Sequence, residues 1–332
     1  MKHYYYLTEK GTKTSYKYIY EVENDKAIRL MLIEEIVGYS ISHHLTPNKK
    51  TEIEILKGES LLNAIYQRDK IYKNYKDLKK YDKVVEVKNE PGIFYPRIYR
   101  PILPSQQSSS SIDELKNTIK DHSGRFEVFM PKEEEIMINA INQLSILTDE
   151  LNSIFKTVQP TKENHSTYGH NIRNLIILVC TEVEAQLKGI LKVNSVVIKN
   201  SYNTKDYVKL KEVLKLDQYK VKFNYYPSIQ SFSPFKNWDI NNPTRSLKWY
   251  DGYNAIKHDR EGEFKKATLN NAISAISALA ILIIAQYGDK ISYWNERIGN
   301  YYNFQTLPSW SLLDFYLPPI EKSNWTKSSL KL

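Results

Sequence analysis

The chain has 332 residues, of which 41% are hydrophobic and 26% are charged; this composition excludes a largely disordered protein and allows about two domains. The net charge of +9 and the 26 tyrosines favour phosphate contacts and base stacking, although a Lys-rich coding background produces the same composition. The single cysteine, Cys180, excludes an internal disulfide and a cysteine-based zinc site and indicates a reducing compartment. Because the opening MKHYYYLTEKGTK lacks the apolar core of a signal peptide, we expect a cytoplasmic protein.

Residues 1–103 have mixed patterns and predict an α/β region. The runs HYYYLTE and TSYKYIYEVE are aromatic and β-branched and are joined by KGTK, which predicts a β-hairpin. The next run, AIRLMLIEEIVGYSI, has apolar residues at helical spacing and predicts a helix. Strand-like patterns then return in TEIEIL, KVVEV and GIFYPRIYRPIL.

A basic run, RDKIYKNYKDLKK, covers residues 68–80. It places Lys73, Lys76 and Lys80 at helical spacing with tyrosines between them. The run predicts either a nucleic-acid-binding stripe or an ordinary solvated helix face. PSQQSSSS then begins a stretch with nothing to bury, and we interpret residues 104–130 as a linker.

From residue 131 onward the predicted elements are helical. PKEEEIMINAINQLSILTDELNSIFKTV begins with proline and acidic residues, as a helix start favours. Its apolar residues Ile138, Ile141, Ile146 and Leu147 predict an amphipathic helix. HNIRNLIILVCTEVEAQLKGIL is apolar all round in its middle, which predicts a helix inside a bundle.

Two further helices are predicted around residues 245–258 and 262–287. The second contains NAISAISALAILIIAQYG, whose strictly apolar part is much shorter than the roughly 20 residues that a membrane span needs. We therefore expect a buried core helix. The overall prediction is an α+β chain with a mixed α/β region, a linker, a helical domain over residues 131–290 and an aromatic, Pro-rich tail over residues 291–332.

The segment SLKWYDGYNAIKHDREGEF contains the main candidate site. Helical spacing places Asn254, Lys257 and His258 on one face. A histidine transfers protons near neutral pH, and Lys257 or Arg260 would stabilise a charged phosphorane. The alternative is a polar helix end with local ion pairs.

The predicted helix that begins at residue 170 carries a second polar set, formed by Arg173, Glu182 and Glu184. These charged groups are either buried and paired or catalytic. The sequence contains no Gly-rich phosphate loop, no HExxH and no serine-hydrolase elbow. We accordingly expect no metal site and no cofactor.

Two segments separated by an insertion together resemble the HEPN superfamily of helical bundles from bacterial defence, toxin and RNA-processing systems. They are RNLIILVCTEVEAQLKGIL and WYDGYNAIKHDREGEFKKATLNNAISAISALAILIIA. The resemblance covers roughly residues 130–290. It implies a bundle of four or five helices that dimerises and, in many members, a metal-independent endoribonuclease. The family signature is an arginine followed by four to six residues and a histidine, often with asparagine directly after the arginine. His258 matches the histidine and Asn254 the polar neighbour, whereas Tyr253 stands where the arginine is expected.

The resemblance implies that His258 moves a proton during transesterification of RNA and that Asn254 orients the phosphate or the imidazole. Lys257, Arg260 or Arg173 would then supply the positive charge. A twofold dimer would bring two copies of His258 to one groove. Because Tyr253 replaces the arginine, the alternative is a bundle that binds nucleic acid or a partner protein without catalysis. The expected partners are therefore RNA, a second copy of the chain or another protein, and not a membrane.

Overall fold

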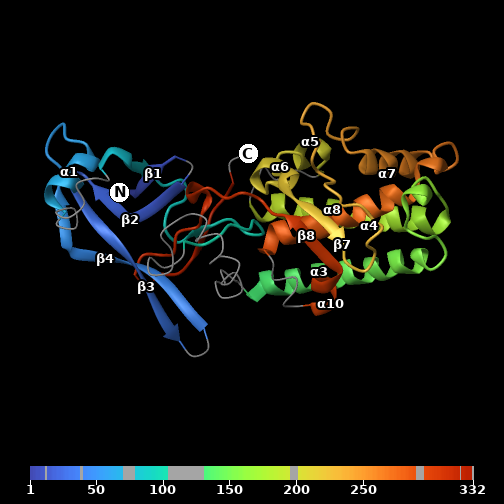
Figure 1. Cartoon of the computed structure of the whole chain (residues 1–332), viewed down its shortest axis with the longest axis horizontal. Helices are drawn as coiled ribbons and strands as arrows, with labels where there is room; N and C mark the ends of the chain where they lie inside the picture. The colour runs from blue at the N-terminus through green and yellow to red at the C-terminus, as the bar shows by residue number, and fades with distance from the viewer. Residues whose placement is uncertain are drawn as a thin grey trace. The chain divides into compact units, whose positions relative to one another are not determined.

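The computed structural model describes residues 1–11, 13–37, 40–69, 79–103, 131–194, 201–288, 295–321 and 323–330. They form an α+β protein (Figure 1), which confirms the predicted fold class. The described residues fall into two compact units. One unit comprises Met1–Phe94, residues 100–103 and Trp310–Lys327; the other comprises Tyr95–Tyr99, the described residues between 131 and 309, and residues 328–330.

The first unit is built on an antiparallel sheet of five strands in the order β4-β3-β2-β1-β5. The strands are β1 Lys2–Lys10, β2 Lys13–Glu23, β3 Lys26–Val37, β4 Ser40–Glu54 and β5 Asp82–Glu86. The predicted hairpin is confirmed, since Lys10 pairs with Lys13. Gly11 between them has a φ of +62°, which glycine adopts without a steric penalty.

The helix predicted for AIRLMLIEEIVGYSI is wrong, because these residues lie mainly in β3. Ala27 and Leu30 are both buried, and their odd spacing places them on opposite faces of the sheet. Each face belongs to a separate hydrophobic cluster. A strand that is covered on both sides does not need alternating polarity, and its continuous apolar run therefore imitates the spacing of a helix.

Helix α1, Leu61–Arg68, covers one face of the sheet through Ala64 and Ile65. The other face is covered by Leu312, Phe315 and Leu317 near the end of the chain. Part of the predicted tail is therefore core material of the first unit.

The strand predicted for GIFYPRIYRPIL is limited to β6, Ile93–Phe94. It pairs in parallel with β9, Thr326–Lys327. Pro96 and Pro101 lack a backbone N–H donor, which explains why the strand does not continue. KVVEV lies largely in β5 and TEIEIL largely at the end of β4, as predicted.

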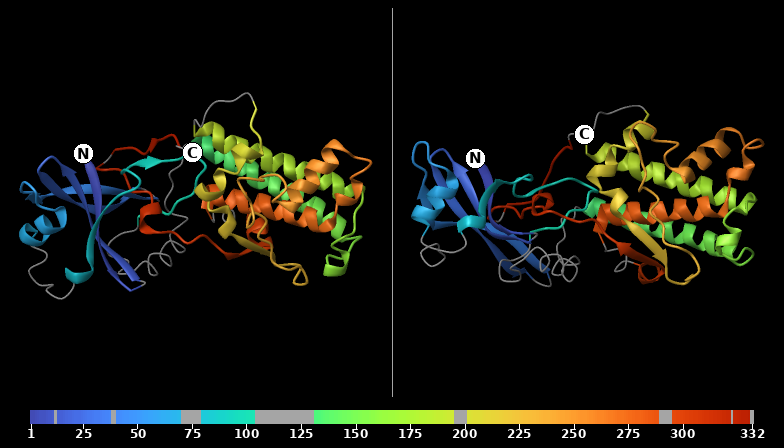
Figure 2. Two further views of the ribbon diagram at one scale, coloured as in Figure 1. Left: turned by 90° about the horizontal axis from the view of Figure 1, so that it is seen from above. Right: turned by 45° about the horizontal axis from the view of Figure 1, so that its top comes forward.

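The second unit is a helical bundle. Its long helices are α3 Pro131–Phe155, α4 His170–Val193, α7 Lys248–His258 and α8 Leu269–Tyr287. Helix α8 contacts the other three (Figure 2). The predicted helices are confirmed, except that the last one begins later, after the 3-10 turn η5, Phe264–Lys266.

Helix α8 has the length and composition of a membrane span, with a mean hydropathy of 1.7, but 89% of its apolar window is buried in the bundle. Every residue from Ala272 to Tyr287 is buried. This agrees with the predicted core helix. The neighbouring helices are less enclosed than predicted, because Ile146 on α3 is 57% exposed and Leu178 on α4 is 53% exposed.

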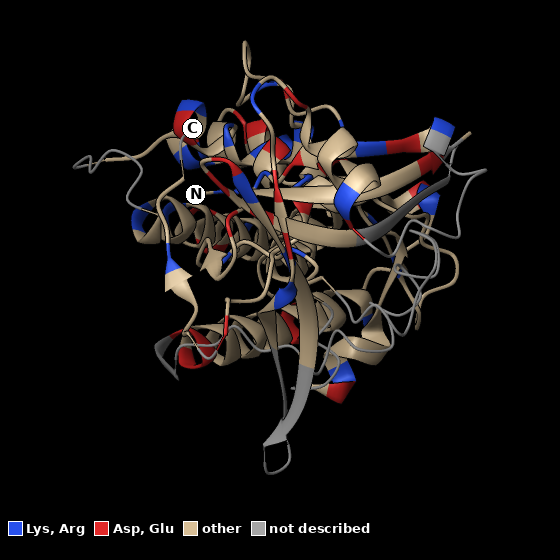
Figure 3. Cartoon of the chain, turned by 90° about the vertical axis from the view of Figure 1, so that its left-hand side faces the viewer, with Lys and Arg blue, Asp and Glu red and all other residues tan. Residues whose placement is uncertain are grey.

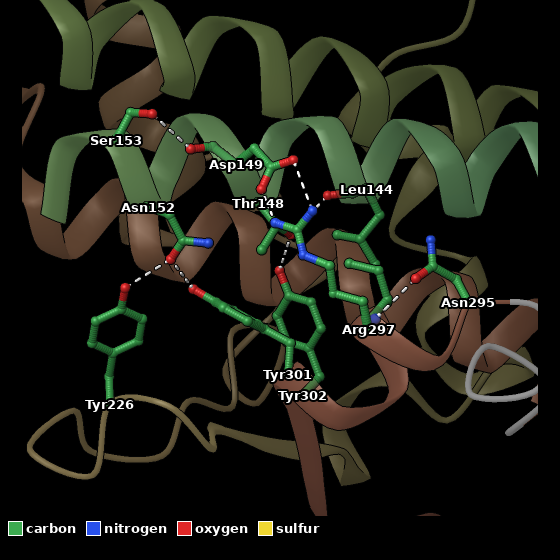
Figure 4. A network of polar contacts seen from close by, with 11 residues as sticks. Leu144, Thr148, Asp149, Asn152, Ser153, Tyr226, Asn295, Arg297, Tyr301 and Tyr302 are labelled. Atoms are coloured by element: carbon green, nitrogen blue, oxygen red, sulfur yellow. Dashed lines mark hydrogen bonds and ion pairs between the residues drawn. The ribbon is translucent and has the colours of Figure 1, made fainter. Parts of the chain in front are cut away.

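The start of the predicted tail is attached to α3 by tyrosines (Figure 4). Strand β8, Tyr302–Thr306, follows α10, Glu296–Tyr301, and pairs with β7, Lys220–Phe223. The Tyr302 hydroxyl bonds the Thr148 hydroxyl at 2.7 Å, and the Tyr301 hydroxyl donates to the Asn152 side-chain oxygen at 2.9 Å. Burial raises the pKa of both tyrosines, which keeps their hydroxyls protonated. This part of the tail therefore belongs to the bundle unit.

Candidate functional site

Helix α7 packs its apolar side chains against the bundle and directs its polar side chains toward the solvent. Its buried residues are Trp249, Tyr250, Gly252, Tyr253 and Ile256, which follow helical spacing toward the bundle. A Cβ on Gly252 would lie 2.6 Å from the Asn271 side-chain nitrogen, so α7 approaches the start of α8 closely. The helix ends at His258. His258 therefore lies at the end of a helix that is packed against the bundle.

Tyr253, at the position of the expected arginine, is 2% exposed and part of the core. Lys257 donates a hydrogen bond from Nζ to the Tyr253 hydroxyl at 3.0 Å and lies 5.0 Å from the centre of that ring. This hydrogen bond, with the negative charge of Glu184 as a smaller contribution, raises the pKa of Lys257. Lys257 is therefore a charged group held against Tyr253.

Glu184 joins α4 to α7. Its Oε1 accepts a hydrogen bond from the Tyr250 hydroxyl at 2.5 Å. Burial, followed by this bond, raises the pKa of Tyr250. Burial and the charge of Glu184 also raise the pKa of the Cys180 thiol, so Cys180 is a protonated core residue. Glu184 is therefore half-buried and paired with a tyrosine hydroxyl and not with Arg173, whose guanidinium donates to Asn174.

Glu182 lies in a different network. It accepts a hydrogen bond from the Gln186 side-chain nitrogen at 2.6 Å, and Gln186 Oε1 accepts one from Arg97 at 2.5 Å. Arg97 also donates from Nε to Gln286 Oε1 at 2.8 Å. Glu182 therefore takes part in binding the segment Tyr95–Tyr99 to the bundle, and these contacts do not include α7.

The remaining predicted residues of α7 are open to solvent. Asn254 is half-buried, and His258 and Arg260 are exposed. Within the part of the chain that the structure describes, no hydrogen bond or ion pair involves these three side chains. The alternative of local ion pairs in KHDRE therefore does not hold for His258 and Arg260, and both are accessible to a ligand.

The loops before α4 and after α7 meet at one end of the bundle (Figure 1). The Leu269 amide donates to the Thr167 carbonyl at 2.8 Å, and Tyr168 forms a β-bridge with Thr268. The chain after His258 turns tightly, because the Gly262 amide donates to Asp259 Oδ1 at 2.8 Å. This end of the molecule is therefore held by backbone hydrogen bonds.

Phe264, in this loop, is the centre of a group that we call the Phe264 cluster, which consists of Tyr168, His170, Arg173 and Phe264. The Phe264 ring lies 4.9 Å from the His170 ring and 5.7 Å from the Tyr168 ring. The Arg173 guanidinium lies over the same ring at 5.9 Å. The structure thus brings Arg173 to the segment that follows His258, and the residues involved come from two distant parts of the sequence.

The predicted basic stripe is only partly within the structure. Lys73 and Lys76 lie outside the described residues. Lys80 is exposed, in the 3-10 turn Lys79–Tyr81, and lies 5.9 Å from the Tyr81 ring. Helix α1 ends at Arg68, and residues 70–78 of this run lie outside the described residues.

Basic and acidic residues are both present on the strands of the sheet, as the blue and red segments of Figure 3 show, and two such pairs join neighbouring strands. Lys2 lies 3.0 Å from Glu86, and Lys26 lies 2.6 Å from Glu52. These pairs offset part of the positive charge of the first unit. Across the described ranges, no group of three or more His, Cys, Asp or Glu side chains is arranged to hold a metal ion.

Comparison with known proteins gives no match: no family model, no curated protein and no solved structure is similar to this chain. The HEPN resemblance of residues 130–290 therefore stays a prediction.

Proposed function

We propose that the chain is a HEPN-like endoribonuclease of a bacterial defence or toxin system that cleaves RNA without a metal ion. The observation that supports this most is the position of His258, which is exposed at the end of α7 and has no partner among the described residues. An imidazole in such a position is accessible to a substrate hydroxyl or to a leaving oxygen, which a general acid or base has to reach.

In the proposed reaction, His258 removes the proton from a ribose 2′-hydroxyl, and the 2′-oxygen attacks the adjacent phosphorus. The bond from phosphorus to the 5′-oxygen breaks, and the 5′-oxygen takes up a proton from an imidazolium. The products are a 2′,3′-cyclic phosphate and a 5′-hydroxyl. Arg260, with Lys257 or Arg173, offsets the charge of the phosphorane, and Asn254 orients the phosphate. A homodimer would supply a second His258 as the acid.

A second candidate is an RNA-binding or protein-binding bundle without catalysis. It is favoured by Tyr253, which is 2% exposed and occupies the place of the signature arginine. It is also favoured by Lys257, whose ammonium is engaged with Tyr253. In this case the positive charge of the chain would serve binding alone, with an affinity that falls steeply as salt increases.

The test is incubation of an end-labelled RNA with the purified chain in chelator at low salt. The proposed enzyme leaves 2′,3′-cyclic phosphate ends and fails to cut a strand whose 2′-hydroxyls are replaced by hydrogen. Binding without products supports the second candidate. If neither binding nor cutting is observed, the enzyme and the RNA-binding form of the second candidate are both contradicted. Co-purification with another protein would then support the protein-binding form.

A further inference from the structure

We propose that the Phe264 cluster binds an unpaired nucleobase of a single-stranded RNA, which stacks on Tyr168 while Arg173 contacts the adjacent phosphate. This inference rests on the proposed RNA binding and specifies where the strand is held.

Tyr168 has the features of a stacking platform. Its side chain is 45% exposed, although it is a large aromatic group. The ring packs edge-to-face on Phe264, with centres 5.7 Å apart and planes at 89°. The β-bridge to Thr268 fixes its backbone. A ring that is already ordered loses little conformational entropy when a ligand stacks on it.

Arg173 supplies the positive charge beside this platform. Its guanidinium lies over Phe264, and its Nε and one terminal nitrogen donate to Asn174 Oδ1 at 3.2 and 2.7 Å. The other terminal nitrogen is buried and has no hydrogen-bond partner in the described part of the chain. Buried donors are usually satisfied. Because this nitrogen is enclosed by protein atoms, a phosphate oxygen reaches it only when the half-buried Arg173 side chain turns toward the bound strand.

The cluster lies within reach of the proposed catalytic group. Phe264 follows His258 by six residues, which limits their separation to about 20 Å. A strand with a phosphate every 3.4 Å or more covers that distance with about six nucleotides or fewer. The tight turn at Asp259 shortens the distance between His258 and Phe264 further. One short strand therefore places a base on Tyr168 and a phosphodiester near His258.

Tyr225 offers a matched control. It is 59% exposed and also packs edge-to-face on another aromatic ring, that of Tyr301, at 5.5 Å. Among the residues for which the structure gives side chains, no lysine or arginine lies over either of these two rings. Loss of this tyrosine removes the same kind of exposed ring without the neighbouring cation.

The experiment measures binding of a 2′-O-methyl RNA of about ten nucleotides, which cannot be cleaved by 2′-attack, with 2-aminopurine as a fluorescent base. We expect the wild type to quench the fluorescence. Tyr168→Ala should weaken binding about 5- to 150-fold, the equivalent of about 1–3 kcal/mol per stacked base, and should abolish the quenching. Tyr168→Phe and Tyr225→Ala should behave as wild type. Arg173→Gln should weaken binding and reduce the salt slope by about 1.

The outcomes separate the two proposals. If the wild type binds and Tyr168→Ala binds equally well with equal quenching, the base site is refuted and the proposed function stands. If the wild type does not bind RNA at all, the proposed function fails and the site fails with it. A DNA strand that binds with the same dependence on Tyr168 supports the site, because stacking does not use the 2′-hydroxyl.

Discussion

Arg97 provides the clearest test of how the bundle unit is held together. It is 8% exposed and donates to Gln286 Oε1 at 2.8 Å and to Gln186 Oε1 at 2.5 Å. Its backbone has a φ of +59°, a conformation that is costly for any residue other than glycine. The side chain thus compensates for backbone strain while joining Tyr95–Tyr99 to α4 and α8.

Arg97→Ala should lower the free energy of unfolding by about 3–5 kcal/mol, because two hydrogen bonds to a charged group are lost and buried acceptors remain. For a unit of this size that corresponds to a fall of about 6–20 °C in Tm. Arg97→Gly loses the same hydrogen bonds but relieves the strain, so it should be less destabilised than the alanine variant by up to about 1 kcal/mol.

Denaturant titration followed by circular dichroism measures both variants. The control is Arg245→Ala, because Arg245 is exposed and its removal should change stability by no more than about 0.5 kcal/mol. An Arg97→Ala variant that is as stable as the control variant would refute this role of the Arg97 side chain. An Arg97→Gly variant that is less stable than Arg97→Ala would refute the relief of backbone strain.

Three further predictions concern the bundle and the sheet. Gly189→Ala should destabilise by about 1–3 kcal/mol in a thermal melt, because its Cβ would collide with the Arg97 guanidinium; an unchanged Tm would contradict this. Tyr253→Arg should destabilise by about 3 kcal/mol or more, since it places a charge at a site that is 2% exposed, and a gain of RNA cleavage without loss of stability would contradict that. Burial is the largest of the effects that raise the pKa of Tyr66 and Tyr207 to about 12. As the pH rises, the unfolded chain therefore loses these two protons before the folded chain does. The contribution of the two tyrosines to the free energy of unfolding is fully present below about pH 10 and should be lost between about pH 10 and 12. A denaturation midpoint that stays constant over this range would contradict this prediction.

Much of the fold follows from local patterns in the sequence. The β1–β2 hairpin is predicted by two aromatic runs around a glycine turn. Helix α3 is predicted by its amphipathic periodicity, and α4 and α8 are predicted by long apolar runs. Strand β3 is not predicted by its sequence, because burial on both faces removes the alternation of apolar and polar residues that identifies a strand. The exposure of Ile146 is likewise not visible in a helical pattern, since the sequence does not show which apolar residue lies at the edge of the buried face.

The site is predictable only in part. Helical spacing places Asn254, Lys257 and His258 on one side of α7, but it does not show that Lys257 is held by Tyr253. The Phe264 cluster and the Arg97 network both join distant parts of the chain. Their recognition requires the tertiary arrangement, and for Arg97 a positive φ that no residue pattern indicates.

The measurement that tests the central claim most directly is the rate of RNA cleavage in chelator by wild type, by His258→Ala and by Lys248→Ala. Lys248 is exposed at the opposite end of α7, so its removal is a matched surface change on the same helix. A general acid–base group contributes about 10²- to 10⁴-fold. We predict a loss of that size for His258→Ala, with an unchanged Tm and with Lys248→Ala as active as wild type. Cleavage by His258→Ala at the wild-type rate would contradict the account.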